Sequence, residues 1–574
     1  MLTEPAQTST PGQGPRTGRT RGRDQIAGHV LDFEKTRLNR PSQRQFSRRQ
    51  GIPRSTLSGW LKQKQSIPAP ADEVAFFESP AGLRVLHRIQ VAAHLVMSLM
   101  GACGIRLVCQ FLDLSGLGPF VASSYGAQRQ VAKQLEAETV KYGKEERARL
   151  AALMSPKAVT LVEDETFHQK PCLVAIEPVS NFIFVEQYSE QRDSASWQHA
   201  VQQSLIGLPV QVLQVASDQG KAVVRHVETE LGVHQSPDVF HVQYEVSRGT
   251  SAPLAAQTRK AEAQLDQASR ALQEVLQQEQ EHAARPAGPG RPPDFAARTT
   301  AAQQAVQQAQ QHVADTQAHP DAMREVLRGI GTCYHPYDLS TGGVVRETEV
   351  KTQRGALFDK ARAVAHKASL PTRCTERIEK AARVVPKMVA TVAFFHALVG
   401  QWVATLDVPV PVVSLLLKVL IPMLYLQRAA RRAKDATARV AIEQVVSQLD
   451  AAFHAAPAAW RALPEATRSC AWALAQQCAD LFQRSSSCVE GRNGQLSLRH
   501  HHLHQISTGR LQALTVIHNY MLHRADGTTA AQRLFGVRPR DLFTSLCQRL
   551  PLPARPRNRR RSPATPSSAH PPPT

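Results

Sequence analysis

This sequence lacks paired cysteines, an apolar leader and an evident membrane span. Its nine cysteines are scattered, without any Cys-x-x-Cys pair, so we expect reduced thiols and neither a disulfide framework nor a structural zinc site. The first 23 residues are polar and contain no apolar segment, which predicts no secretory signal and a cytoplasmic location. One run, residues 388–406, is apolar enough to consider as a membrane span, but it contains His396 and Gln401. We interpret it as a buried core helix and expect no membrane partner.

Acidic residues are scarce at both ends of the chain. The 574 residues include 69 Lys and Arg against 48 Asp and Glu, a net charge of +21 with histidine neutral. Residues 1–64 hold 13 basic and 4 acidic side chains, and residues 551–574 hold five arginines and no acid, so the two ends carry +14 of the total. This excess favours a polyanionic partner such as a nucleic acid. The length predicts about three to five structural units.

A helix-turn-helix pattern lies in the basic N-terminal part, over residues 41–64. A short amphipathic helix with Phe46 inside is followed by a turn at Gly51 and by a second helix with Pro53 in its first turn and Leu57 on its apolar side. The second helix fits the major groove of DNA, where hydroxyls and Arg reach base edges and Lys neutralises phosphates. The predicted DNA contacts of the two helices are Arg44, Arg48, Arg49, Arg54, Ser55, Thr56, Ser58, Lys62 and Lys64. The alternative is a helical hairpin that is merely exposed to solvent.

Strand patterns are confined to one stretch of the chain. The runs AVTLVEDETF, CLVAIEP and NFIFVEQY, between residues 158 and 188, predict an antiparallel meander. A helix, a buried strand VQVLQVASD, a second helix after Gly220 and a short last strand over 238–244 complete the order β-β-β-α-β-α-β. This order indicates an α/β fold, with a mixed sheet and helices on its faces. The Ala- and Gln-rich sequence that follows predicts a large all-α insertion, which includes an antiparallel helical hairpin over residues 254–318.

The composition along the chain predicts seven segments. They are a disordered basic arm (1–25), a helix-turn-helix domain (26–70), a helical connector (71–153), the first part of the α/β core (154–248), the α-helical insertion (249–483), the final part of the core (484–546) and a disordered Pro/Arg-rich tail (547–574).

Three acidic residues are candidates for one site. Asp164 lies at the end of the first predicted strand and Asp218 at the end of the buried strand, where open α/β sheets place ligands. Two carboxylates in one small site repel unless a divalent cation lies between them, and hard oxygen ligands suit Mg²⁺ or Mn²⁺. Glu490, in a predicted first helical turn with Asn493 one turn later, is the candidate third acid. The alternative is that each acid only caps a helix, closes a turn or compensates a helix dipole.

Four runs, VEDETF, ASDQGKA, PDVFHV and SSCVEGRNGQLSLRHH, resemble those of bacterial insertion-sequence transposases of the DDE superfamily. The resemblance covers residues 158–247 and 484–543. It implies an RNase H-like core in which Asp164, Asp218 and Glu490 are the catalytic, metal-binding acids. It further implies two Mg²⁺ or Mn²⁺ ions, hydrolysis and strand transfer of DNA phosphodiesters, and a bacterial protein associated with the nucleoid.

Two further assignments depend on this resemblance. Asp238 and His241 match an Asp-x-x-His element of related transposases, in which the histidine either orients the metal site or only satisfies a buried hydrogen bond. Glu163 and Glu165 flank the first acid, so its assignment to Asp164 depends on the DET run and on strand alternation.

The resemblance also implies partners. Double-stranded DNA, both the terminal repeats of the element and the target, is the expected substrate, and Arg492 and Arg499 are predicted to contact it beside the third acid. A homo-oligomer is expected because two DNA ends must be handled together, with the helical hairpin as its surface. The cluster His500, His501, His502 and His504 has no acidic or Cys partner in sequence, and we interpret it as a DNA-facing or solvated helix rather than a metal site.

Two other functions remain open from the sequence. One is a transposase-derived DNA-binding protein that has lost catalysis. The other is an RNase H-like nuclease that cleaves DNA without joining it. The intact set of acids favours an active transposase over the first of these.

Overall fold

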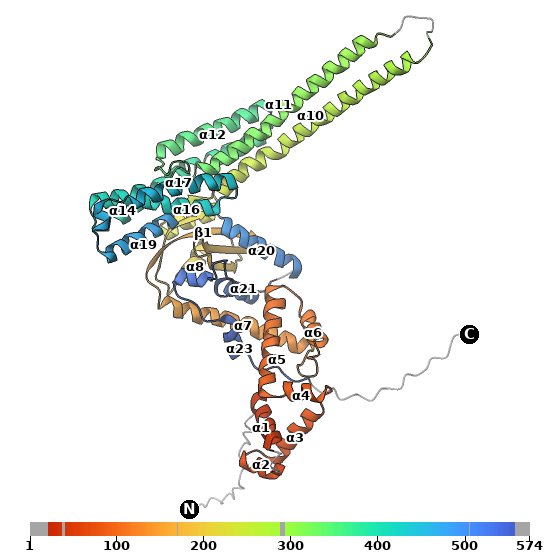
Figure 1. Ribbon diagram of the computed structural model, residues 1–574, viewed down its shortest axis with the longest axis vertical. Helices are drawn as coiled ribbons and strands as arrows, with labels where there is room; N and C mark the ends of the chain where they lie inside the picture. Colours follow the sequence, from red (N-terminus) through yellow and green to blue (C-terminus); the bar gives the residue numbers. More distant parts are fainter. Residues whose placement is uncertain (1–20, 37–40, 169, 287–292, 504–505, 557–574) are drawn as a thin grey trace, which may run out of the picture. The chain divides into compact units, whose positions relative to one another are not determined.

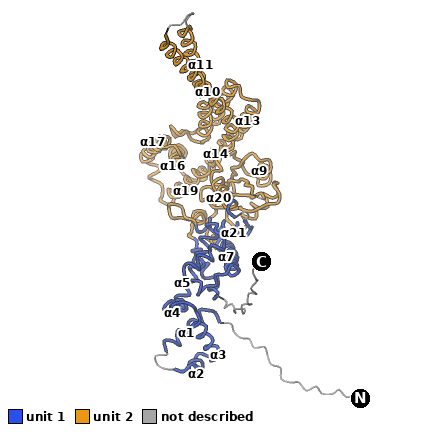
Figure 2. The backbone as a smooth tube through the Cα atoms, turned by 90° about the vertical axis from the view of Figure 1, so that its right-hand side faces the viewer, with its two compact units in different colours: residues 1–147, 501–521, 539–574 blue, residues 148–500, 522–538 orange. Residues whose placement is uncertain are grey.

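The computed structural model describes residues 21–36, 41–168, 170–286, 293–503 and 506–556. The chain divides into two compact units, which Figure 2 colours separately. Unit 1 contains residues 1–147, 501–521 and 539–574, and unit 2 contains residues 148–500 and 522–538. Most of the predicted basic arm, and the RNRRR run of the predicted tail, lie outside the described residues.

Unit 1 begins with three short helices, α1 (Arg23–Thr36), α2 (Gln43–Arg49) and α3 (Arg54–Gln65). A capping box joins Ser42 and Gln45 at the start of α2, each side chain accepting the other's backbone N–H. Gly51 turns the chain toward α3 with a φ of +60°, a conformation that glycine adopts without steric cost. Because α1 begins at Arg23, the predicted disordered arm extends too far into the chain.

An apolar cluster holds these three helices together. Phe33 of α1 packs edge-on against Phe46 of α2, with ring centroids 5.3 Å apart. Leu57 of α3 is fully buried beside them, and Trp60 packs partly buried against the cluster. The predicted helix-turn-helix pair and its apolar residues are therefore confirmed, and α1 supplies the third side of the core.

The remainder of unit 1 is helical, as predicted for residues 71–153. The helices are α4 (Ala71–Phe77), α5 (Pro80–Ala92), the π-helical segment η2 (Ala93–Met100), α6 (Ile105–Leu114), α7 (Tyr125–Ala151, which continues into unit 2), α21 (Thr508–Tyr520) and α23 (Leu542–Arg549). Phe120 is buried in the core of these helices, ahead of α7.

The chain after α23 packs against unit 1 instead of leaving it at residue 547. The carboxylate of Glu78 is almost wholly buried and pairs with the guanidinium groups of Arg23, at 2.7 Å, and Arg555. The carbonyl of Ala554 accepts the backbone N–H of Ala122 at 2.7 Å. Residues 550–556 therefore belong to the folded unit, and the prediction of a tail from residue 547 is wrong, because Arg555 pairs with the buried carboxylate of Glu78 and Ala554 bonds to the backbone of Ala122.

Unit 2 contains a five-stranded mixed sheet in the order β3-β2-β1-β4-β5. β2 pairs antiparallel with β1 and β3, and β4 runs parallel to β1 and β5. The order β-β-β-α-β-α-β and the mixed sheet are confirmed, so the chain has an α/β fold with a large helical part. The elements are β1 (Lys157–Phe167), β2 (Pro171–Glu177), β3 (Phe182–Tyr188), α8 (Ser194–Leu205), β4 (Val210–Ser217), α9 (Lys221–Arg225), the π-helical segment η3 (His226–Leu231) and β5 (His234–Pro237).

The last strand does not lie where the sequence predicted it. β5 ends at Pro237, and the segment predicted as strand, residues 238–244, is the first part of helix α10 (Val239–Ala283). The Asp238 side chain accepts the backbone N–H of Phe240 at 2.9 Å, so Asp238 is the N-cap of this helix. The apolar run VFHV is typical of a strand, but an Asp directly before it is also a signal for the start of a helix.

A helical block follows the sheet within unit 2. α10 and α11 (Phe295–Thr332) lie side by side as a long antiparallel hairpin (Figure 1). The hairpin is longer than the predicted 254–318, because the helices continue through Pro253 and Pro320. The other helices of the block are α12 (Glu347–Lys367), α13 (Thr372–Ala382), α14 (Val385–Ala404), α15 (Val410–Leu415), the π-helical segment η4 (Leu416–Leu420), α16 (Ile421–Arg432), α17 (Ala436–His454), α18 (Ala458–Arg461) and α19 (Glu465–Leu481).

The apolar run at 388–406 forms most of α14, and one face of that helix is in the core of the block. Met388, Phe395 and Val399 are fully buried there. Among the described residues two stretches, 372–404 and 410–432, are long and apolar enough to cross a membrane by length and composition. That is weak evidence for a membrane protein, because core helices of soluble proteins pass the same test. Unit 2 ends with α20 (Ser487–Leu503), which continues into unit 1, and with α22 (Ala530–Phe535).

Candidate active site

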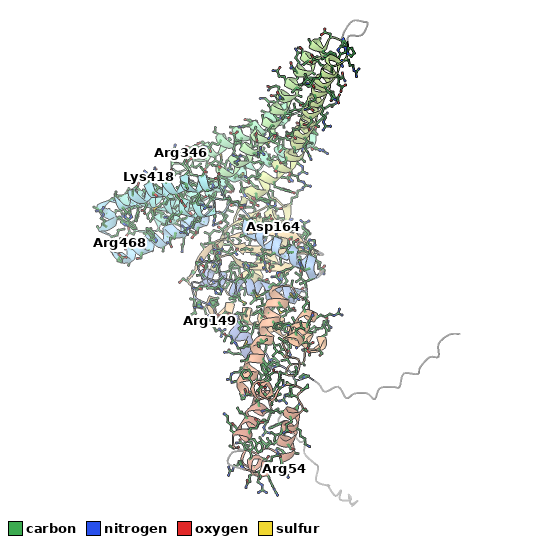
Figure 3. All side chains as sticks on the ribbon, turned by 45° about the vertical axis from the view of Figure 1, so that its right-hand side comes forward. Arg54, Arg149, Asp164, Arg346, Lys418 and Arg468 are labelled. Carbon is green, nitrogen blue, oxygen red and sulfur yellow. The ribbon has the colours of Figure 1, made fainter. Side chains whose placement is uncertain are left out.

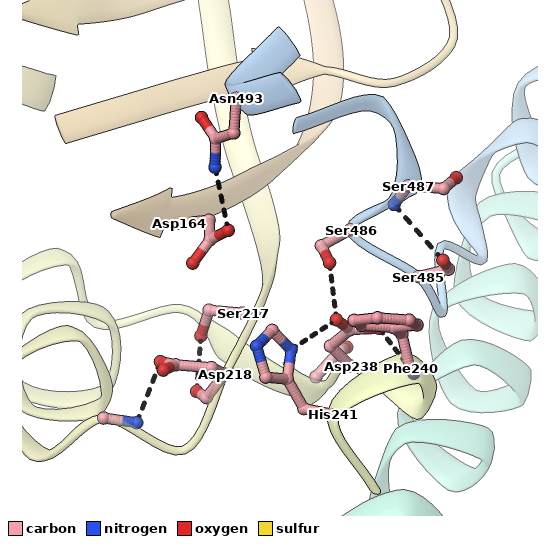
Figure 4. Close-up of polar contacts among 12 residues, drawn as sticks. Asp164, Ser217, Asp218, Asp238, Phe240, His241, Ser485, Ser486, Ser487 and Asn493 are labelled. Atoms are coloured by element: carbon pink, nitrogen blue, oxygen red, sulfur yellow. Dashed lines mark hydrogen bonds and ion pairs between the residues drawn. The ribbon is translucent and has the colours of Figure 1, made fainter. Parts of the chain in front are cut away.

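Asp164 lies near the end of β1, on the face of the sheet that α20 covers. Asp164 pairs with Val174 of β2, which pairs with Glu186 of β3, and cross-strand partners share a face of a sheet. The Asn493 amide of α20 donates from Nδ2 to Asp164 Oδ2 at 3.1 Å (Figure 4). The backbone N–H of Glu165 donates to Asp164 Oδ1 at 2.8 Å. Both carboxylate oxygens are therefore held in place.

The two flanking glutamates lie on the opposite face of the sheet. Glu165 accepts a hydrogen bond from Trp197 Nε1 of α8 at 3.0 Å. Glu163 is fully buried, and its Oε1 lies 3.7 Å from His226 Nε2 of η3. Of the acidic run in β1, Asp164 is thus the residue that faces α20, as strand alternation predicted.

Asp218 directly follows β4, the parallel neighbour of β1. The register pairs Glu163 with Ser217, so Asp164 and Asp218 are the next residues in line on the two strands. Asp218 Oδ1 accepts the backbone N–H of Gly220 at 2.9 Å. A Cβ atom at position 220 would come within 2.9 Å of that same oxygen, so glycine allows this turn to close on the carboxylate.

The chain between α19 and α20 brings the third acid to the same face. Thr160 Oγ1 of β1 donates to the carbonyl of Leu481 at 3.0 Å, and Gln214 Nε2 of β4 donates to the carbonyl of Gln483 at 3.3 Å. These bonds fix the connecting chain across the two central strands. α20 then begins, with Glu490 in its first turn.

The pKa of Asp164 reflects both its burial and the acids near it. Its pKa is raised from the ordinary value of 3.8 to about 7. Burial is the largest cause, and the charges of Glu490 and Asp218 act in the same direction, whereas the hydrogen bond from Glu165 and the charge of His241 oppose it. The structure therefore brings Asp218 and Glu490 within electrostatic reach of Asp164.

The Asp-x-x-His pair lies beside these acids. Asp238 Oδ2 is 2.7 Å from His241 Nδ1 and accepts the hydroxyl of Ser486 at 2.5 Å (Figure 4). Burial by itself lowers the pKa of His241, but the hydrogen bond with Asp238 and the charges of Asp238, Asp164 and Asp218 raise it to about 9. His241 is therefore an imidazolium at neutral pH. Sequence reasoning missed Ser486, whose only signal was its place in a run of serines.

The donor chemistry of the site fits a hard divalent cation. Within the described residues, no group of three or more His, Cys, Asp or Glu side chains is already close enough to hold a metal ion. The three carboxylates and Asn493 are nevertheless all oxygen donors, and the buried Asn493 Oδ1 has no hydrogen-bond partner. A bound cation would also offset the charges of Glu490 and Asp218, which add to the effect of burial on the pKa of Asp164.

Arg492 does not face solvent, contrary to its prediction as a DNA contact. Its guanidinium donates from Nε to Glu186 Oε1 at 2.6 Å and from Nη2 to Glu186 Oε2 at 2.7 Å. The Glu186 side chain is wholly buried, so the pair fixes α20 to β3 at the depth of the sheet. The two residues are 306 positions apart, and no local pattern links them. Arg499, also predicted to contact DNA, lies partly exposed on α20.

The histidine cluster is divided between two environments. The ring of His500 stacks on that of His168, with centroids 3.9 Å apart. Burial, together with the charge of His168, lowers the pKa of His500 to about 4. The interpretation of the cluster as solvated is therefore wrong for His500, which packs against the sheet. His501 and His502 are exposed, and His504 lies outside the described residues.

The predicted DNA contacts of the helix-turn-helix remain mostly available. Arg54 lies at the surface of α3 (Figure 3). Lys64 differs, because its ammonium forms an ion pair with Glu34 of α1 at 2.7 Å. Arg44, Arg48, Arg49, Ser55 and Lys62 are exposed, and Thr56 and Ser58 are partly buried.

The fold defines an α/β protein with a small mixed sheet and a large helical part. Residues 416–562 match a sequence family, DUF6399, that is described as a family of unknown function. That stretch includes Glu490 and the helices around it. No curated protein and no solved structure matches the chain.

Proposed function

We propose that this protein is a DNA transposase with an RNase H-like core, which binds the ends of its element and cuts and joins DNA strands. The observation that carries the proposal is that Asp218 directly follows the parallel neighbour of β1, in line with Asp164, and that the charges of Glu490 and Asp218 both raise the pKa of Asp164. Turn and capping roles alone do not require three acids from distant segments to share one surface. The order of the strands, with the first acid on the central strand and the second after its parallel neighbour, also supports an RNase H-like core.

Asp164, Asp218 and Glu490 would hold the two Mg²⁺ or Mn²⁺ ions, which when bound activate the attacking oxygen and stabilise the leaving oxygen of the phosphodiester. The remaining groups position these acids. Asn493 Nδ2 holds Asp164, and the Gly220 N–H holds Asp218. No covalent intermediate with the protein is required.

His241 contributes a fixed positive charge to the same surface. Asp238 holds its Nδ1, and the raised pKa of about 9 keeps the imidazolium protonated at neutral pH. The cation attracts the negatively charged phosphodiester toward the acids, and it compensates part of their charge before a metal binds.

The N-terminal helices support DNA as the substrate. α2 and α3 expose several basic and hydroxyl side chains on one compact three-helix module, which suits phosphate neutralisation and base contact in the major groove. The net charge of +21 points to the same partner. Homo-oligomerisation, with the α10–α11 hairpin as the joining surface, belongs to this proposal because two DNA ends are processed together.

A strand-cleavage and strand-joining assay tests the proposal. Full-length protein is incubated with Mn²⁺, a duplex that carries the inverted repeats flanking its gene, and a plasmid target. We expect nicking at the repeat end and joined products, both abolished by Asp218→Ala. Cleavage without joining and without end preference would instead indicate an RNase H-like nuclease. Metal-independent end binding with no cleavage would indicate a DNA-binding protein that has lost catalysis.

A further inference from the structure

A basic cavity lies directly beside the candidate active site, within unit 2. Its volume is about 610 Å³, and it is lined by Arg432, Lys434 and Arg484 together with Phe240, Ser485 and Ser487. No acidic residue lines it. A second cavity of about 180 Å³ shares the same three cations, but Asp435 also lines it, and it continues toward His335 and Tyr425 in the helical block.

The three cations are not neutralised by neighbouring carboxylates. Arg484 donates from Nη1 to the carbonyl of Gly331 at 2.5 Å, and Arg432 donates from Nη1 to the amide oxygen of Gln483 at 3.3 Å. Across the described ranges no ion pair joins Arg432, Lys434 or Arg484 to an acid. Arg428, which also borders the second cavity, differs in this respect because it pairs with Asp480.

The buried histidine of the second cavity responds to this charge. His335 is buried and 2.7 Å from the hydroxyl of Tyr425. Its pKa lies well below the ordinary value of 6.5, first because of burial and then because of the charges of Arg484, Arg354 and Arg432. Asp435 borders the second cavity, whereas the larger cavity has three cations and no acid in its lining. Such an excess of positive charge is costly unless an anion from outside completes it.

Residues that line the cavity are close in sequence to Asp238 and Glu490 of the candidate site. Phe240 follows Asp238, the partner of His241, and Ser485 and Ser487 flank Ser486, which bonds the same carboxylate (Figure 4). Ser487 is also the first residue of the 17-residue helix α20, whose first turn carries Glu490. The positive end of that helix dipole thus opens toward the cavity and adds to the attraction for an anion.

We propose that this cavity binds a phosphate group of the DNA strand whose neighbouring phosphodiester lies at the acids, and so sets the position of the cleaved bond. The inference rests on the proposed function for its substrate class. Arg432 and Lys434 are exposed and Arg484 is partly buried behind them, which suits a strand that passes along the opening. Arginine and lysine together give a bidentate contact and a point charge for successive phosphate oxygens.

The test is the salt dependence of DNA binding by the full-length protein. The double variant Arg432→Ala/Lys434→Ala removes two exposed cations of the cavity. The matched control is Lys418→Ala/Arg431→Ala, which removes the same charge from exposed positions of the same helical stretch that line neither cavity (Figure 3 labels Lys418). Affinity for a fluorescent duplex is measured by anisotropy in EDTA, between roughly 50 and 200 mM salt. Circular dichroism checks that both variants are folded.

The loss of one phosphate contact, made by two cations, should reduce the slope of log K against log salt by about 0.9 and weaken binding roughly fourfold at the higher salt concentration. The control should keep the slope of the wild type. An unchanged slope in the cavity variant, or an equal loss in both variants, would overturn the inference.

A second arm separates DNA from free phosphate. Inorganic phosphate is titrated calorimetrically into the wild type and the cavity variant. Phosphate binding that disappears in the variant, with DNA binding unchanged, would make this a site for a free anion and would overturn the assignment to DNA. Because binding is measured in EDTA, the result does not depend on cleavage, and failure of the proposed function shows separately as absence of Mn²⁺-dependent nicking by the wild type.

Discussion

Replacing Asp164 with asparagine should stabilise the metal-free protein while abolishing its activity. In the wild type the carboxylate of Asp164 is half-buried beside Asp218 and Glu490, and its pKa is raised from 3.8 to about 7. Asparagine has nearly the same shape and carries no charge. Its amide oxygen can still accept the hydrogen bond from the Glu165 backbone N–H, and its amide nitrogen can donate to the unpartnered Oδ1 of Asn493 once that amide turns over.

The magnitude follows from the shift in proton affinity. A pKa difference of one corresponds to 1.36 kcal/mol, so the rise from 3.8 to about 7 corresponds to roughly 4 kcal/mol of unfavourable interaction with the ionised carboxylate. Because solvent still reaches part of the side chain, we expect about half of this, roughly 2 kcal/mol. Because the pKa of Asp164 is higher in the folded than in the unfolded protein, protonation of Asp164 favours the folded state. The wild type loses this stability as pH rises from about 4 to about 7, so the advantage of Asp164→Asn grows over that range and is constant above it.

Hydrogen exchange of the β1 amides in EDTA measures the opening free energy of the sheet directly. At pH 8 the opening free energy of these amides should be about 2 kcal/mol higher in Asp164→Asn than in the wild type. Near pH 4 this difference should be much smaller. Asp266→Asn, at an exposed position of α10, is the control and should change nothing. Mn²⁺ at 100 times its dissociation constant should protect the wild type by about 2.7 kcal/mol and leave the variant unaffected. Lower protection of Asp164→Asn at pH 8, or a difference independent of pH, would refute the electrostatic account of the site.

Three other outcomes are expected. Arg492→Met leaves Glu186 as a buried unpaired carboxylate and should lower the free energy of unfolding by about 3–5 kcal/mol in thermal or urea unfolding. Most of this loss should be recovered when Glu186 is also replaced with methionine. A small loss in the single variant would contradict the buried pair. Burial lowers the pKa of His234 from 6.5 to about 4. The free energy of unfolding should therefore fall as pH drops from 6.5 toward 4, by up to 1.36 kcal/mol per pH unit. Urea unfolding of His234→Asn should lack this contribution to the pH dependence. Leu57→Ala removes a fully buried side chain of α3 and should destabilise the N-terminal helices by about 2–5 kcal/mol. Anisotropy should then show weakened DNA binding, whereas the Mn²⁺-dependent protection of the β1 amides should stay that of the wild type.

The sheet and the positions of its acids could be predicted because they depend on local patterns. Alternation along β1 separated Asp164 from Glu163 and Glu165, and the register with β4 brought Asp218 beside it. The helix pair around Gly51 was equally local, since a turn glycine and apolar spacing specify it.

Contacts over long sequence separations could not be predicted in this way. Arg492 was expected at the surface, because nothing near it in sequence indicates that Glu186 is buried beneath it. The same applies to Arg555, which pairs with Glu78 and holds the supposed tail. The displaced last strand had a local cause, because Asp238 caps a helix through a side-chain bond that competes with the extended conformation.

The central claim is that Asp164, Asp218 and Glu490 act together in metal-dependent DNA cleavage. The most direct test measures the initial rate of Mn²⁺-dependent nicking by the wild type, by Asp164→Asn, Asp218→Asn and Glu490→Gln, and by the variant with all three changes. Residues that act as a unit lose activity non-additively, so each single variant should fall at least about 100-fold and the triple variant hardly further, while Asp266→Asn keeps the wild-type rate. Nicking that survives any of the three single changes would contradict the account.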